Sequence, residues 1–300
     1  MLKKTGIQHI TRILILYKIL HLESTDVCNL ACPACAREVD PAFRKDSKHH
    51  LTVEQIHNHI SESEIAQLDK MFMCGNYGDP AAGYFTASIF QYFRKINPDI
   101  TLGMNTNGSL RDTKWWEDLA TILNHLKDYV VFSIDGLEDT NHVYRKNVNW
   151  DRVINNARTF IEAGGNAQWD MLVYEHNQHQ VDACEQLARD MGFKWFRAKV
   201  SKRPFVNGLE FPIGWKQSQI VAKKVDCHAL KEQSVYIDAQ GRTSPCCWLG
   251  DRQKDFIKDF ESVQQSWSSL NPNIKCLETC GTDETTTSFN NQWQREVQLC

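Results

Sequence analysis

Residues 28–35 read Cys28-Asn29-Leu30-Ala31-Cys32-Pro33-Ala34-Cys35, so three and then two residues separate three cysteines. The loop closely follows an apolar run, Ile15–Leu22, which we interpret as the first strand of the fold. Three thiolates in one short loop can hold three irons of a cubane cluster and leave the fourth iron open to another ligand. A zinc ion completed by a distant His or Cys is the alternative, although the C-x3-C-x2-C spacing of this loop is not the paired C-x2-C arrangement typical of zinc.

Five further strand candidates follow this loop, and segments with helical periodicity fill the intervals between them. The strands are expected at Lys70–Cys74, Ile100–Asn105, Tyr129–Ile134, Ala167–Tyr174 and Lys194–Lys199, and the helices at Val53–Leu68, Tyr84–Ile96, Lys114–Leu126, Trp150–Ala163 and His179–Met191. This alternation indicates parallel βα units. Six strands are fewer than the eight of a closed barrel, so we predict an α/β fold built on a partial (β/α)6 TIM-like barrel. In such a fold the chemistry lies at the carboxyl ends of the strands.

Composition excludes several classes of protein. The chain of 300 residues is 42% hydrophobic and 24% charged, which is typical of a globular protein. Its net charge of −3 gives no bulk electrostatic case for binding nucleic acid or an anionic membrane. Lys18 interrupts the apolar run at residues 13–20, which is too short to span a bilayer and is followed by no cleavage site. We therefore expect a cytoplasmic protein that does not contact membranes.

The distribution of the eleven cysteines divides the chain into two regions. Without a secretory signal, clustered cysteines favour metal binding over disulfides. Six cysteines fall in the last quarter of the chain: Cys227, Cys246, Cys247, Cys276, Cys280 and Cys300. Residues 201–226 contain two prolines and two glycines and are interpreted as a linker between a domain at 1–200 and a smaller, cysteine-rich domain at 227–300. Residues 234–243 predict a β-hairpin in that domain, whereas Cys74 and Cys184 are expected to be ordinary buried thiols.

The CxxxCxxC loop after the first strand resembles that of the radical S-adenosylmethionine superfamily, and similar segments follow at later strand ends in the family order. These segments are Gly75-Asn76-Tyr77-Gly78-Asp79, Asn105-Thr106-Asn107-Gly108, Ser133-Ile134-Asp135-Gly136, and Leu172-Val173-Tyr174. Each alone is common in turns, and only their order carries the resemblance. One departure is Ala34, because the residue before the third cysteine is usually aromatic in this family.

The resemblance implies that Cys28, Cys32 and Cys35 hold a 4Fe–4S cluster and that a set of strand-end residues binds S-adenosylmethionine. That set is Gly75, Asn76, Gly78, Asp79, Asn105, Asn107, Ser133, Asp135, Arg145 and Val173. By the same resemblance, Asp79 would meet the methionine amino group, and Ser133 and Asp135 the carboxylate and ribose. The guanidinium of Arg145 would form a bidentate pair with the methionine carboxylate. The segment around Val173 would pack on the adenine.

The spacing of Cys227, Gly241 and Cys246 resembles the opening of the SPASM and twitch extensions of this family, which carry auxiliary iron–sulfur clusters. No C-x2-C pair is found in the last quarter of the chain, so the shorter twitch version with one auxiliary cluster, expected to be 4Fe–4S, fits better. The expected ligands are Cys227, Cys246, Cys276 and Cys280, with Cys247 and Cys300 as possible substitutes. A zinc knuckle formed by the same four thiols is the alternative.

The resemblance implies an oxidoreductase that reductively cleaves S-adenosylmethionine to a 5′-deoxyadenosyl radical, which abstracts hydrogen from a substrate. An external electron donor such as flavodoxin or ferredoxin would reduce the cluster. A small polar molecule, or a peptide held directly in the barrel mouth, is expected as substrate, because no extra domain that would grip a leader peptide is apparent. Aromatic residues that would either line the barrel mouth or lie in the core are Tyr77, Trp169, Trp195 and Trp248.

Two alternatives remain. One is a non-catalytic scaffold in which both cysteine regions bind zinc, which gives no role to Asn76, Asp79 or Asp135. The other is an RNA-modifying member of the same superfamily. An RNA-modifying enzyme would need a basic face, and only the short run at residues 199–203 suggests one.

Overall fold

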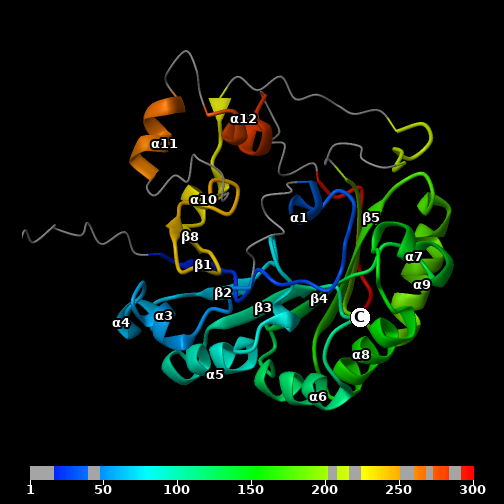
Figure 1. Cartoon of the computed structure of the whole chain (residues 1–300), viewed down its shortest axis with the longest axis horizontal. Coiled ribbons are helices and arrows are strands. Elements are labelled where there is room, and N and C mark those ends of the chain that lie inside the picture. The colour runs from blue at the N-terminus through cyan, green and yellow to red at the C-terminus, as the bar shows by residue number, and fades with distance from the viewer. Residues whose placement is uncertain are drawn as a thin grey trace, which may run out of the picture.

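A parallel sheet forms the centre of the chain. The computed structural model describes residues 17–39, 48–201, 208–215, 224–250, 260–267, 273–283 and 292–300. In this part of the chain the main sheet has nine strands in the order β11-β6-β5-β4-β3-β2-β1-β8-β9 (Figure 1). The parallel strands are β1 (Ile19–Leu22), β2 (Lys70–Met73), β3 (Thr101–Thr106), β4 (Tyr129–Ser133), β5 (Ala167–Val173), β6 (Trp195–Val200) and β8 (Ser234–Ile237). The predicted α/β fold with a partial barrel is confirmed.

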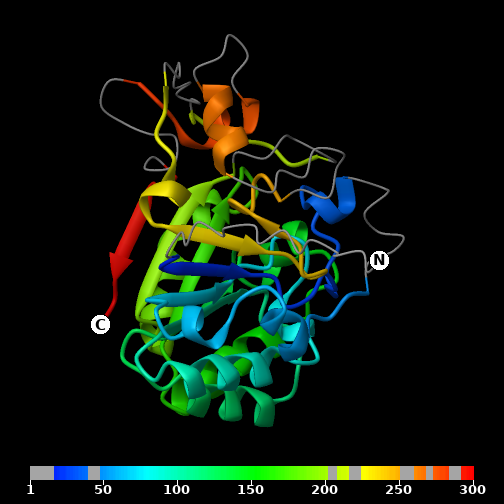
Figure 2. The same ribbon diagram turned by 90° about the vertical axis from the view of Figure 1, so that its left-hand side faces the viewer.

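Helices cover the outer face of the curved sheet, as Figures 1 and 2 show for α5, α6, α8 and α9. The helices of the barrel are α1 (Ala36–Val39), α3 (Val53–His57), α4 (Glu62–Ile65), α5 (Thr86–Ile96), α6 (Thr113–Ile122), α7 (Glu138–Tyr144), α8 (Trp150–Glu162) and α9 (Val181–Met191), with 3-10 turns η1 (Pro80–Ala82) and η2 (Gln178–Gln180). The single helix expected over residues 53–68 is two short helices. Ser61 starts the second one, because its side chain and that of Glu64 form a capping box.

Strand alternation separates a helix-facing core from an inner face. The helix-facing side chains Met71, Phe132 and Trp169 are fully buried. The ring of Trp116 from α6 lies 5.3 Å from that of Phe132. Trp169 therefore belongs to the core rather than to the barrel mouth, and its indole donates a hydrogen bond to the carbonyl of Ile134 at 2.9 Å.

The C-terminal region continues the same sheet. The predicted hairpin is present, because β8 pairs antiparallel with β9 (Thr243–Ser244). Strand β8 also pairs in parallel with β1, so a continuous ladder joins this region to the barrel. The remaining elements here are β7 (Lys224–Val225), α10 (His228–Lys231), α11 (Phe260–Trp267), α12 (Ile274–Cys280) and β10 (Gly281–Thr282). The domain boundaries at 200 and 227 stay a prediction, and residues 15–16, 202–207 and 216–223 of the expected strand and linker lie outside the described residues.

The last strand, β11 (Arg295–Gln298), returns to the opposite edge of the sheet and pairs antiparallel with β6. Arg295 forms ion pairs with Asp182 and Glu185 of α9. Within the described part, no helix is both long and apolar enough to cross a membrane.

Candidate functional site

The first three cysteines lie in a packed loop at the carboxyl ends of the strands. The loop lies against Tyr144, Tyr174 and Leu172. The amide of Cys35 donates to the carbonyl of Cys32 at 2.9 Å, which tightens the turn that carries both thiols. Ala34, at the position usually aromatic in the resembled family, is only 6% exposed in this packing.

Burial controls the protonation of these thiols. Burial, with a smaller effect from the Asp79 carboxylate, raises the pKa of Cys28 to about 12. Burial also raises the pKa of Cys32 to about 11, although the Arg145 guanidinium opposes this shift. Both thiols are therefore protonated at neutral pH, and metal binding would have to release their protons.

No group of three His, Cys, Asp or Glu side chains in the described ranges is arranged to hold a metal ion. A cubane cluster takes each thiolate on a different iron, so its ligands need not converge on one point. Three thiols in one loop supply the donor chemistry that such a cluster requires.

The loop after β2 is fixed to the end of β1. The amide of Asn76 donates to the Glu23 carboxylate at 2.7 Å, and Arg37 donates to the carbonyl of Tyr77 at 2.9 Å. A Cβ on Gly78 would lie 2.1 Å from the carbonyl oxygen of Thr25. Close packing of the two loops therefore accounts for the glycine without a ligand.

Asp79 connects the same loop to the end of β3. Its Oδ1 accepts hydrogen bonds from the Thr106 hydroxyl at 2.8 Å and the Ala81 amide at 2.9 Å. Its Oδ2 accepts one from the Asn107 amide at 2.7 Å. Burial raises the pKa of Asp79, and these three bonds oppose that rise. A carboxylate offers about four acceptor positions, so one on Oδ2 remains for a ligand amine.

Asn107 connects the end of β3 to the cysteine loop. Its side-chain amide donates to Oδ1 of Asn29 at 3.1 Å and lies 3.7 Å from the sulfur of Cys28. Its Oδ1 accepts from the amide of Ser109 at 2.9 Å. These bonds give Asn107 a structural role besides the cofactor role that the resemblance implies. Asn105 and Ser133 lie partly buried on the inner face of the sheet.

Asp135 and Arg145 form a buried ion pair at the end of β4. Nε of Arg145 donates to Oδ2 of Asp135 at 2.6 Å, and the amide of Leu172 donates to Oδ1 at 2.6 Å. The negative charges around Arg145 raise its pKa further despite burial, so the guanidinium stays charged. Strand alternation puts the Val173 side chain in the helix-facing core, so Leu172 is the neighbour on the inner face.

The second group of cysteines surrounds a cavity of about 150 Å³. Its lining includes Cys247 and all four expected ligands, which are Cys227, Cys246, Cys276 and Cys280. Burial raises the pKa of Cys246 to about 12, and Cys227 and Cys276 are near enough to add to the rise. Cys276 and Cys280 lie one turn apart on α12, which brings both thiols to one side of that helix.

The two substitute ligands lie differently. Cys247 accepts a hydrogen bond from the Asn76 side chain and lies near Cys74 and Glu23, so it contacts the loop after β2. The sulfur of Cys300 lies 3.5 Å from the carbonyl of Phe193, which precedes β6. Cys300 is therefore at the amino end of β6, and it is not among the residues that line the cavity.

The remaining aromatic candidates do not form one surface. Tyr77 is buried beside Glu23, Trp248 is 52% exposed, and Trp195 begins β6 at its amino end. Sequence reasoning missed Glu23, Asp26 and Arg37. Glu23 and Asp26 closely follow β1, and Arg37 lies in α1 after the third cysteine. Their partners lie farther along the chain, at Asn76, His49 and Tyr77 respectively.

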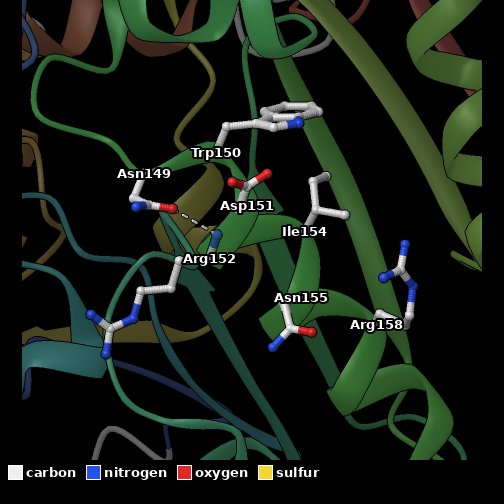
Figure 3. A pocket seen from close by; sticks show the side chains of 7 residues that line it. All are labelled: Asn149, Trp150, Asp151, Arg152, Ile154, Asn155 and Arg158. Atoms are coloured by element: carbon white, nitrogen blue, oxygen red, sulfur yellow. Dashed lines mark hydrogen bonds between the residues drawn. The ribbon is translucent and has the colours of Figure 1, made fainter.

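A separate hollow of about 620 Å³ lies at the start of α8 (Figure 3). It is open to solvent, and Oδ1 of Asn149 accepts a hydrogen bond from the amide of Arg152 there at 2.9 Å. Its lining contains none of the expected site residues.

Comparison with known proteins places this geometry in context. The model of the Radical SAM superfamily matches residues 22–187. No match is found among curated proteins. The structure of Streptococcus suis SuiB bound to S-adenosylmethionine aligns with a TM-score of 0.56 and 15% identity, covering 85% of this chain and 66% of that one. The structure of SuiB bound to precursor peptide SuiA aligns with a TM-score of 0.57 and 15% identity, covering 85% of this chain and 65% of that one.

The structure of anSMEcpe with bound AdoMet and Cp18Cys peptide aligns with a TM-score of 0.55 and 14% identity, covering 76% of this chain and 73% of that one. The chain thus spans just under two thirds of the length of SuiB. At these identities the alignments show a shared fold.

Proposed function

The chain belongs to the radical SAM superfamily, and from this premise we propose that it is an oxidoreductase that acts on a small polar molecule or a peptide. The observation that carries the proposal is the packed loop with Cys28, Cys32 and Cys35 at the carboxyl ends of the strands. Asn107, which follows β3, and Arg145, which follows α7, both contact this loop. A reactive centre bound to this loop would face the side chains on the inner face of the barrel.

The residues present fit a 4Fe–4S cluster and S-adenosylmethionine. The three thiols would hold the cluster, and Oδ2 of Asp79 would accept a hydrogen bond from the methionine amino group. Arg145 donates to Asp135 through Nε and also forms a hydrogen bond with Cys32, and its remaining N–H groups would meet a carboxylate. When bound, the reduced cluster and S-adenosylmethionine supply a 5′-deoxyadenosyl radical that abstracts hydrogen from the substrate.

We further propose that residues 227–300 form a twitch-like unit that binds one auxiliary 4Fe–4S cluster. The cavity lined by Cys227, Cys246, Cys276 and Cys280 supports this assignment. Four thiols complete the ligand set of such a cluster, unlike the three of the first loop. A cluster with a complete ligand set suits electron transfer, so the net reaction would be an oxidation.

The inner face of the barrel suits a polar substrate. Asp170 of β5 and Arg197 of β6 form a bidentate ion pair there, with distances of 2.7 and 3.0 Å. SuiB and anSMEcpe, which share the fold, were solved with bound peptides, and this supports a peptide as one substrate class. An external donor such as flavodoxin or ferredoxin would supply the electrons.

The experiment that tests the proposal is anaerobic turnover of reconstituted protein with dithionite and S-adenosylmethionine. We expect 5′-deoxyadenosine, quantified by mass spectrometry, from the wild type and none from a variant in which Cys28, Cys32 and Cys35 are all alanine. Iron analysis of both proteins is the control. A wild-type protein that binds zinc and takes up no iron after reconstitution would contradict the proposal and favour the scaffold.

A further inference from the structure

The barrel side of the cysteine-lined cavity is a row of three rings. Phe72, His21 and Tyr236 lie in register across β2, β1 and β8. The imidazole of His21 stacks on Phe72 at 4.5 Å between ring centroids and meets the edge of Tyr236 at 4.9 Å. All three residues line the cavity together with the four expected ligands. The row therefore forms a wall of the cavity, on the part of the barrel's inner face that these thiols share.

Two members of this wall carry a buried polar atom that has no hydrogen-bond partner among the residues that the structure describes: Nε2 of His21, which is 6% exposed, and the hydroxyl of Tyr236. The hydroxyl of Tyr236 lies near Glu23 and Cys247, whereas His21 lies between the two other rings. A buried polar nitrogen without a partner is destabilising, so such an atom calls for an explanation. Burial, with a smaller effect from Lys70, lowers the pKa of His21 to about 3, so its imidazole is neutral and carries one N–H.

The position of this nitrogen suits an outer partner of a cluster. Four thiols already complete the coordination of a 4Fe–4S cluster, so an imidazole in the same cavity is not needed as a ligand. Cluster sulfurs accept hydrogen bonds, and such bonds are among the features that set the reduction potential. A donor stabilises the reduced state more than the oxidised state, because the reduced cluster carries more negative charge.

We propose that Nε2–H of His21 donates a hydrogen bond to a sulfur of the cluster held by Cys227, Cys246, Cys276 and Cys280, and thereby raises its reduction potential. This inference rests on the auxiliary cluster proposed above. His21 is a tuning residue, because it would act on the cluster through a hydrogen bond without binding an iron. Its stacking on Phe72 fixes the ring plane, so the direction of the N–H bond is fixed with it.

The experiment uses the full chain with Cys28, Cys32 and Cys35 replaced by alanine, so that only the auxiliary cluster titrates. Its midpoint potential is measured by an EPR-monitored redox titration, with iron content determined on the same samples. The variants are His21→Phe, which keeps a ring and removes the donor, and His21→Gln, whose amide can donate from a similar position. Tyr236→Phe is the matched control, because its phenol lies near Glu23 and Cys247 instead.

We expect about four irons per chain in all samples, a lower potential in His21→Phe, and potentials near the starting value in His21→Gln and Tyr236→Phe. Equal potentials in all variants would overturn the inference. Loss of iron from both His21 variants would also overturn it, because His21 would then be a ligand or a structural residue. If the starting protein itself binds no iron, the auxiliary cluster is refuted and the role of His21 falls with it.

Discussion

Cys184 and Cys300 differ in their access to solvent, which controls thiol reactivity together with pKa. Cys184 is fully buried in the core under α9, and burial raises its pKa to about 12. Cys300 is exposed at the end of β11. Because the thiolate is the nucleophile, a buried, protonated thiol reacts slowly.

We therefore expect iodoacetamide at pH 8 to alkylate Cys300 in the native protein and to reach Cys184 only in urea. Peptide mass spectrometry checks both sites in one sample. Equal rates at the two cysteines in native protein would contradict the burial of Cys184. If bound iron protected Cys300 from alkylation, this result would instead indicate that Cys300 is a cluster ligand.

The lowered pKa of His21 also predicts how the free energy of unfolding depends on pH. Its pKa of about 3 in the folded chain lies below the value near 6.5 expected when unfolded. The unfolded chain therefore binds the proton first, so the stability is complete above about pH 6.5 and is lost as pH falls toward 3. Near pH 5 this loss is about 2 kcal/mol.

Urea unfolding of the iron-free chain at pH 8 and pH 5 measures the effect. We expect the wild type to lose more free energy of unfolding than His21→Phe over this interval, and the difference between the two proteins removes the contribution of other groups. A difference that does not change with pH would show that His21 titrates normally in the folded chain.

At the scale of elements, the loops that follow β1 and β2 depend on one another. Glu23 at the end of β1 accepts hydrogen bonds from the second loop, and Gly78 allows the chain to pass the carbonyl of Thr25. Both loops carry residues of the candidate site. Their packing therefore controls where Cys28 and Asp79 lie.

Gly78→Ala tests this dependence. The added Cβ would meet backbone atoms rather than a side chain that can turn away, so the loops must separate. We expect a loss of about 2 kcal/mol or more in the free energy of unfolding, and weaker binding of S-adenosylmethionine in equilibrium dialysis. Gly164→Ala is the control, because it meets no atom within 4 Å and costs only the strain of its positive φ. Equal losses of stability and binding in the two variants would argue against the contact.

The strands were predictable from sequence, since alternation and length place all six barrel strands within a few residues of their observed ends. The short helix α7 and the division of residues 53–68 were not predicted, because helical periodicity alone does not reveal a capping box inside an apolar pattern. Contacts of Glu23 with Asn76 and of Asn107 with Asn29 link segments far apart in the chain. No local pattern records such pairs, which is why the sequence indicated site residues but not their partners.

At the scale of the whole molecule, the two edges of the sheet have different functions. Strands β8 and β9 extend one edge toward the second cysteine group, whereas β11 covers the other edge at β6 (Figure 1). Trp293, just before β11, makes cation–π contacts with Arg197 and Lys199, whose guanidinium carbon and ammonium nitrogen lie 4.5 and 4.4 Å from the centroid of its ring. The end of the chain is therefore a structural strap, distant in the sheet from the thiols in the cavity.

Truncation of the chain after residue 291 tests whether β11 has a structural role that is separate from the cysteine cavity. The truncation uncovers the backbone of β6 and removes the buried Leu299 side chain. An exposed strand edge promotes pairing between molecules, and burial of one leucine contributes about 1.5–3 kcal/mol. We expect a lower Tm and aggregation visible by light scattering, while iron per chain in the soluble fraction stays at the wild-type value. Arg295→Ala, which removes only the ion pairs to α9, should lower Tm less. A truncated chain that keeps its Tm but loses iron would reverse the assignment, because the strap would then support the cysteine sites rather than the sheet edge.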